Sequence, residues 1–122
     1  KYFSLVIIIW FDSIENGLEI QMIIITWQDW VKFKIGDNNI IMAHSHFGHD
    51  VNVGNNTEIC TSTVLGGYVT IKDGAKLKIG CLIRNRITVG ENAIIGMGAV
   101  VTKNVEDNSV VYGNPARVKN LK

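Results

Sequence analysis

The chain has 122 residues, 47% of them hydrophobic and 19% charged, and its formal net charge at pH 7 is +1. This length is enough for one domain with a useful buried core. So small a net charge gives no global field that would attract nucleic acid or an anionic membrane surface. We therefore expect one domain without a nucleic-acid or membrane partner, and a cytoplasmic location by default.

Residues 1–34 contain no single repeating pattern, and we expect irregular N-terminal coils or a cap. The apolar run 5–11 is too short to span a bilayer, and it lacks the cleavage site of a signal peptide. The chain starts with Lys1 rather than Met, which suggests a processed or truncated product. Three tryptophans are expected to cover the end of the following structure: Trp10, Trp27 and Trp30.

Residues 35–106 repeat with a period of six. Helices place apolar residues every three to four positions and half-buried strands every two, so this period indicates stacked coils built from short strands and turns. Three hexads to a triangular coil would give four coils. The aliphatic or aromatic anchors are Ile35, Ile41, Phe47, Val53, Ile59, Leu65, Ile71, Leu77, Ile83, Val89, Ile95 and Val101.

The positions around the anchors support this interpretation. Glycine often follows an anchor, where we expect the backbone to turn tightly. The position two before the next anchor is small or β-branched, as a corner would require, and this series extends from Ser45 to Val105. Cys60 and Cys81 occupy compact positions of the repeat, so we interpret them as packing residues rather than as a disulfide or metal motif.

Residues 107–122 leave the repeat and form a short C-terminal tail. The segment passes through Asp107-Asn108-Ser109 and Gly113-Asn114-Pro115. Pro115 has no N–H to donate and should end strand pairing.

The hexads resemble those of the left-handed β-helix acyltransferase superfamily. The stretch from Lys34 to Val69 resembles the UDP-N-acetylglucosamine acyltransferases of lipid A synthesis. Gly48-His49-Asp50-Val51-Asn52-Val53-Gly54 resembles an element of sialic-acid and bacillosamine acetyltransferases. The ending Gly113-Asn114-Pro115-Ala116-Arg117 resembles that of acetyl-CoA-dependent transferases. The resemblance implies an all-β fold, a left-handed parallel β-helix, assembled as a homotrimer with active sites between subunits.

Three histidines fall within six residues, at positions 44, 46 and 49, and the chain has no others. By resemblance, His49 is the general base and Asp50 its acidic partner. An imidazole with a pKa of roughly 6.5 can take a proton from an attacking hydroxyl or amine near neutral pH. A carboxylate beside it stabilises the imidazolium that forms. The two residues would therefore carry the catalysis, unless the cluster is a coincidence of solvent-facing turns.

Other site residues also come from the resemblance. His46 would contact substrate, as would Glu58 and Tyr68, although these two replace histidines of the relatives; Arg84 replaces another. Gly67 would donate its backbone N–H to the developing oxyanion. Cofactor contacts are expected at Ile79 and Met97, which would line the pantetheine groove, and at Lys103 and Arg117, which would hold phosphates.

Basic residues gather in the second half of the chain. They are either solvated loop charges or a rim that holds the phosphates of a cofactor or sugar nucleotide. They are Lys72, Lys76, Lys78, Arg84, Arg86, Lys103, Arg117 and Lys119.

The leading hypothesis is acetyl transfer from acetyl-CoA, as co-substrate, to an amino or hydroxyl group of a nucleotide-linked sugar, with no metal. Because the chain ends soon after its last coil, we rank this above transfer from acyl carrier protein. A zinc hydratase could use the offset between His44 and His49, but a third histidine is lacking near Glu19. A non-catalytic scaffold would not need the pair His49 and Asp50.

Overall fold

The computed structural model describes residues 2–4, 11–13, 18–20 and 32–121. The three tryptophans expected to cover the stack, Trp10, Trp27 and Trp30, lie outside the described residues. The expectation for residues 1–34 can therefore be compared with the structure at residues 32–34, where the first strand of the repeat begins, and at three short strands before them. These are β1 (Tyr2–Ser4), β2 (Phe11–Ser13) and β3 (Leu18–Ile20).

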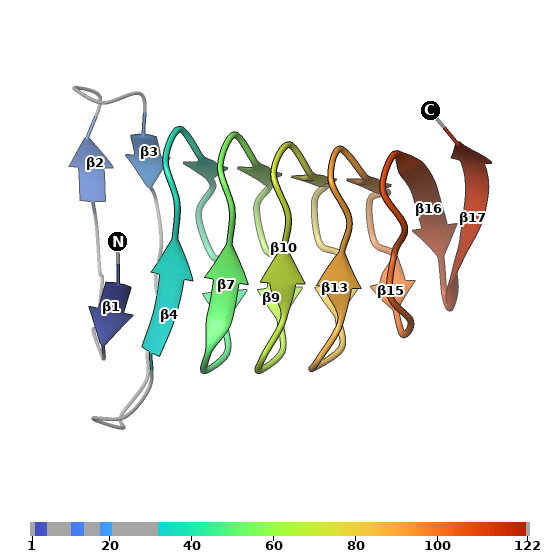
Figure 1. Ribbon diagram of the computed structural model, residues 1–122, viewed down its shortest axis with the longest axis horizontal. Helices are drawn as coiled ribbons and strands as arrows, with labels where there is room; N and C mark the ends of the chain where they lie inside the picture. Colours follow the sequence, from blue (N-terminus) through green and yellow to red (C-terminus); the bar gives the residue numbers. More distant parts are fainter. Residues whose placement is uncertain (1, 5–10, 14–17, 21–31, 122) are drawn as a thin grey trace.

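The repeat folds into a three-sided prism of short parallel strands, stacked along one axis (Figure 1). Face 1 contains β4 (Lys32–Ile35), β7 (Val51–Val53), β10 (Thr70–Ile71) and β13 (Thr88–Val89). Face 2 contains β5 (Ile40–Ile41), β8 (Glu58–Ile59), β11 (Lys76–Leu77) and β14 (Ile94–Ile95). Face 3 contains β6 (His46–Phe47), β9 (Val64–Leu65), β12 (Leu82–Ile83) and β15 (Val100–Val101).

Each coil takes eighteen residues, as the expectation of three hexads requires. On face 1, Val53 lies beside Ile35 and Ile71, and Ile71 lies beside Val89. The chain runs from face 1 to face 2, then to face 3 and back. We call the connecting turns corner 1–2, corner 2–3 and corner 3–1. The prediction of a coiled all-β fold is confirmed.

The anchors fill the interior of the prism. All twelve are at most 3% exposed, and Phe47 is the largest fully buried side chain among the described residues. The compact positions between them are buried too, including Cys81, whose pKa is raised by burial to about 11. Cys60 is also buried and free, so both cysteines pack as expected. The inward register read from the sequence is confirmed.

The glycines that follow the anchors serve a different purpose from the one expected. The backbone turns through positive φ three residues after each anchor from Ile35 to Ile95, as at Asn38 and Asn56, and not at these glycines. They are needed because the next coil lies against them. A Cβ on Gly48 would lie 2.6 Å from the amide nitrogen of Gly67, and one on Gly66 would lie 2.6 Å from that of Asn85.

The last coil is two residues shorter than the others. Val105 pairs with Val89, sixteen residues back, so it occupies an anchor position instead of the compact position assigned from the sequence. Parallel pairing continues beyond residue 106, since β16 (Ser109–Gly113) lies beside β14, with Val111 next to Ile95. The hexad count drifts here because corner 3–1 shortens after Val101.

Both ends of the prism carry antiparallel strands (Figure 1). At the C-terminal end, β17 (Ala116–Leu121) turns back on β16, so segment 107–122 is a paired hairpin. Pro115 lies in its turn, after a cis peptide bond, and pairing resumes at Ala116. At the other end β1 pairs with β4, and β3 pairs with β2 and with β5. Within the described ranges, no helix is long and apolar enough to cross a membrane.

Candidate active site

His49 and Asp50 lie together at corner 3–1, in the turn between β6 and β7. Nδ1 of His49 is 3.1 Å from Oδ2 of Asp50, and the two side chains are 50% and 45% exposed. If Nδ1 carries the proton, it donates to the carboxylate, and Nε2 is then the basic nitrogen. This is the arrangement that a general base at an open surface requires.

Gly67 lies against the imidazole, one coil further along. A Cβ at this position would be 2.7 Å from Nε2 of His49, so the ring has its place only because residue 67 lacks a side chain. The Gly67 carbonyl accepts a hydrogen bond from the amide of Arg86 at 2.9 Å. The Gly67 N–H has no acceptor within the described part of the chain. A free amide beside the basic nitrogen is a suitable donor to a developing oxyanion.

Tyr68 and Arg86 complete the same corner. The rings of His49 and Tyr68 are 4.9 Å apart between centroids and meet edge to face, at 89°. The guanidinium carbon of Arg86 lies 4.5 Å from the centroid of the Tyr68 ring. From the sequence, Arg86 is expected only as one of the basic residues of the second half. Its separation from Tyr68 and Asp50 by one and two coils of eighteen residues is the signal that would have found it.

His46 lies on face 3 and points outward from β6. Its neighbour along the sheet is Val64, which is followed by Leu82 on the next strand. All three side chains are exposed, and the two apolar ones are 37% and 44% exposed. His46 is therefore on the face that leads into corner 3–1, three residues before His49.

Glu58 lies on face 2 and does not come near His49 by its position in the coil. Its Oε1 is 3.2 Å from Nζ of Lys78, and the Cys60 thiol donates to the same oxygen at 3.4 Å. Burial alone would raise the pKa of the Glu58 carboxyl. The hydrogen bonds from Lys78 and Cys60, with the charges of Lys78 and Lys76, lower it below its ordinary value instead. Within one chain, Glu58 is part of an ion pair outside the histidine corner.

The expected cofactor residues are spread over three parts of the molecule. Ile79 and Met97 project from corner 2–3 and are 52% and 73% exposed. Lys103 is an exposed residue in the shortened last turn of corner 3–1. Arg117 is in β17, opposite Tyr112, and its Nη1 donates to the carbonyl of Ala116 at 3.1 Å. One chain thus brings together His49, Asp50, Gly67 and Tyr68, but not the cofactor set.

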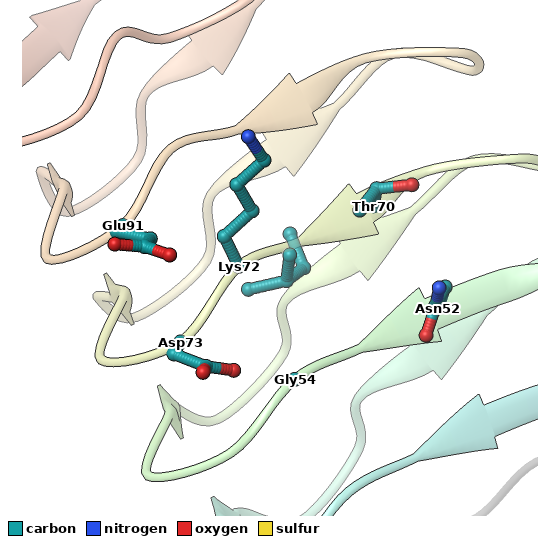
Figure 2. Close-up of a pocket in the computed structure, with 7 residues that line it drawn as sticks. Asn52, Gly54, Thr70, Lys72, Asp73 and Glu91 are labelled. Carbon is teal, nitrogen blue, oxygen red and sulfur yellow. The ribbon is translucent and has the colours of Figure 1, made fainter.

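A shallow depression lies on face 1, away from the histidine corner (Figure 2). Asn52 and Thr70 border it on the strands, and Lys72, Asp73 and Glu91 border it near corner 1–2. None of the expected catalytic, sugar or pantetheine residues lines it, although Lys72, one of the basic residues considered for phosphate binding, does. Over the described ranges, no three His, Cys, Asp or Glu side chains form a group that could hold a metal ion. His44 lies at corner 2–3, whereas His49 lies at corner 3–1, so the two do not share a turn.

Comparisons with known proteins agree with this fold. The sequence model of the bacterial transferase hexapeptide family (six repeats) matches residues 34–67 and 68–103, more than half of the chain. The acyl-[acyl-carrier-protein]–UDP-N-acetylglucosamine O-acyltransferase of Pseudomonas paraeruginosa is 36% identical over 96 residues. The match covers 79% of this chain and 37% of that protein, so the chain spans less than two fifths of this relative's length.

Solved structures give the same result. WeeI from Acinetobacter baumannii AYE aligns with a TM-score of 0.71 and 30% identity, over 80% of this chain and 46% of that one. Arabidopsis UDP-N-acetylglucosamine acyltransferase aligns with a TM-score of 0.70 and 32% identity, over 71% and 30%. With its hexad register, its three-sided prism and these matches, the chain belongs to the bacterial transferase hexapeptide family, in the left-handed β-helix acyltransferase superfamily.

Proposed function

We propose that the protein transfers an acyl group from a thioester to an amino or hydroxyl group of a nucleotide-linked sugar, with acetyl-CoA as the leading donor. The observation that carries this proposal is the contact between His49 and Asp50, 3.1 Å apart on an open corner. An oriented imidazole that solvent and substrate can reach fits a reaction that begins with removal of a proton from the acceptor.

The reaction runs in two steps around His49. Nε2 takes the proton of the acceptor hydroxyl or amine as its oxygen or nitrogen bonds to the thioester carbon, while Asp50 accepts the hydrogen bond from Nδ1–H. The tetrahedral intermediate then collapses, the C–S bond breaks, and the imidazolium returns its proton to the leaving thiolate. The products are the acylated sugar and a free thiol, and no metal is needed.

Gly67 is the proposed donor to the oxyanion. Its N–H has no acceptor within the described ranges, and a Cβ at this residue would lie 2.7 Å from Nε2 of His49. A backbone amide held by the coil costs little reorganisation when negative charge develops on the thioester oxygen.

We further propose a homotrimer, in which cofactor residues of one subunit approach the histidine corner of another. In support, an exposed apolar surface runs over face 3 and corner 2–3: Val64, Ile79, Leu82 and Met97. Apolar clusters of this kind mark interaction surfaces or ligand grooves. Ile79 and Met97 would contact the pantetheine arm, and Lys103 and Arg117 would bind its phosphates. His46, Glu58 and Tyr68 remain proposed contacts of the sugar, and the reaction would take place in the cytoplasm.

Transfer from acyl carrier protein is the alternative that a specific observation favours. The relative from Pseudomonas paraeruginosa, at 36% identity, is named for that donor and for UDP-N-acetylglucosamine. The two alternatives predict the same chemistry at His49 and differ only in what carries the thioester.

Release of free thiol tests the proposal. The protein is incubated with acetyl-CoA or with an acylated carrier protein, each alone and with a panel of UDP- and dTDP-linked amino sugars. We expect thiol release from acetyl-CoA that depends on one acceptor, with the acylated sugar detected by mass spectrometry. Acceptor-dependent thiol release from the acylated carrier protein, with none from acetyl-CoA, would select the alternative donor. No acceptor-dependent release from either donor would contradict the proposal.

A further inference from the structure

Every corner of the prism contains a residue with positive φ, and the residue types differ between corners. Corner 1–2 has Asn38, Asn56, Gly74, Asn92 and Asn108. Corner 2–3 has His44, Ser62, Gly80 and Gly98. Corner 3–1 has Asp50, Tyr68 and Arg86.

Tyr68 and Arg86 are unfavourable choices for this backbone. Their φ angles are 61° and 66°, in the left-handed region where a Cβ is too close to the following carbonyl. Glycine avoids the conflict, and Asn and Asp tolerate it because their short side chains bond locally. The repeat uses these tolerant residues along corner 1–2. The fold alone therefore does not explain a tyrosine and an arginine in corner 3–1.

Tyr68 contacts His49, and Arg86 contacts Tyr68. The Tyr68 ring meets the His49 ring edge to face, and Arg86 stacks on Tyr68. Backbone strain of this kind tends to occur at functional sites, where surrounding contacts hold the residue in place. Tyr68 is 45% exposed, so it contributes little to the core. The described contacts of its ring are those with His49 and with Arg86.

We propose that Tyr68 and Arg86 are positioning residues, which fix the plane of the His49 imidazole at the cost of backbone strain. This rests on His49 being the base of the proposed function. Asp50 engages one nitrogen on an open corner, where a single hydrogen bond leaves the ring free to swing. The perpendicular ring of Tyr68 restricts that swing, and the guanidinium of Arg86 holds Tyr68 in place through a cation–π contact. Nε2 is then kept at Gly67.

The test replaces each residue by one that suits the backbone. Tyr68→Asn and Arg86→Asn should melt at the wild-type temperature or above it, while kcat falls about 10-fold to 100-fold. In Arg86→Asn the KM values should stay within about twofold, whereas Tyr68→Asn also removes a proposed sugar contact and is therefore judged by kcat and by the signals of His49. Tyr68→Phe should keep most of kcat because only the ring is used, and Arg86→Lys should keep more than Arg86→Asn. Ser62→Asn is the matched control, since it gives the same backbone relief at corner 2–3 and should leave kcat unchanged.

An NMR readout separates this inference from the proposed function. The ring protons of His49 should shift in Tyr68→Asn because the neighbouring aromatic ring is lost. Positioning is reported by their relaxation, which should show a more mobile imidazole in Tyr68→Asn and in Arg86→Asn. That result would support positioning even if no acceptor were found in the thiol assay. Unchanged ring signals with unchanged kcat would overturn the proposal. In Arg86→Asn, a rise in the acceptor KM with kcat unchanged would also overturn the proposal, and would make Arg86 a substrate-binding residue instead.

Discussion

Corner 1–2 and corner 3–1 are built on the same turn but are used differently. At corner 1–2 the side chains of one coil bind the amides of the previous coil. Asn55 accepts from the Asp37 amide at 2.7 Å, Asp73 from that of Asn55 at 2.8 Å, and Asp107 from that of Glu91 at 2.8 Å. At corner 3–1 the Gly67 amide has no acceptor in the described part of the chain, and the positive-φ positions hold Tyr68 and Arg86.

The difference between the two corners shows where a periodic fold can hold a functional site. Corner 1–2 satisfies three of its turn amides, those of Asp37, Asn55 and Glu91, through Asn and Asp side chains, which favours stability. Corner 3–1 leaves the Gly67 amide without such an acceptor in the described part of the chain, accepts strained residues and exposes an imidazole. In a repeat protein, the positions that depart from the stable choice at one corner are therefore candidates for function.

The interior shared by both corners should be the most sensitive part of the molecule. Val89→Asp places an unpaired charge among fully buried side chains, and we expect a loss of about 4 kcal/mol or more in the free energy of unfolding. Thr88→Asp is the matched control on the outward side of the same strand and should change stability by about 0.5 kcal/mol at most. Equal free energies of unfolding for both variants, measured in urea, would contradict the inward register of Val89.

The adjacent glycines Gly66 and Gly67 at corner 3–1 should respond differently to the same substitution. Gly67→Ala should lower kcat about 100-fold while the protein melts almost normally, because the new methyl displaces a half-exposed ring. Gly66→Ala should instead lower the melting temperature, since its methyl would meet the backbone of the next coil. If Gly67→Ala kept full activity, the imidazole would not need the position described here.

Loss of a buried, hydrogen-bonded side chain at corner 1–2 should affect stability alone. Asn39 is fully buried, and its Oδ1 accepts from the amide and the hydroxyl of Thr57 at 2.8 and 2.7 Å. Asn39→Ala leaves both donors unpaired, so we expect a loss of about 2 kcal/mol in urea unfolding with kcat unchanged. A parallel loss of kcat at a temperature where the variant is folded would show that the two corners are not independent.

The coils could be predicted from the sequence, because the dry interior requires an apolar residue at every sixth position. The sequence was misleading at the glycines, since the clash that excludes a Cβ at Gly48 comes from another coil. The drift at Val105 was missed because a turn shortened by two residues still presents a small apolar residue at the expected position.

The site was predictable in part. His49 and Asp50 are adjacent in the chain, so their contact needs no folding information beyond the turn. Arg86 was missed because its role depends on a stack of coils rather than on a local motif. The assignment of Glu58 rested on resemblance alone, and the residue lies on face 2 in an ion pair with Lys78.

The most direct test of the central claim measures kcat and the melting temperature of His49→Ala in the same preparation. We expect kcat to fall by about 10²–10⁴-fold, the usual contribution of a general base. The melting temperature should stay close to that of the wild type, because the side chain is half exposed. A variant that keeps near-normal kcat would contradict the account, and the base would have to be sought elsewhere.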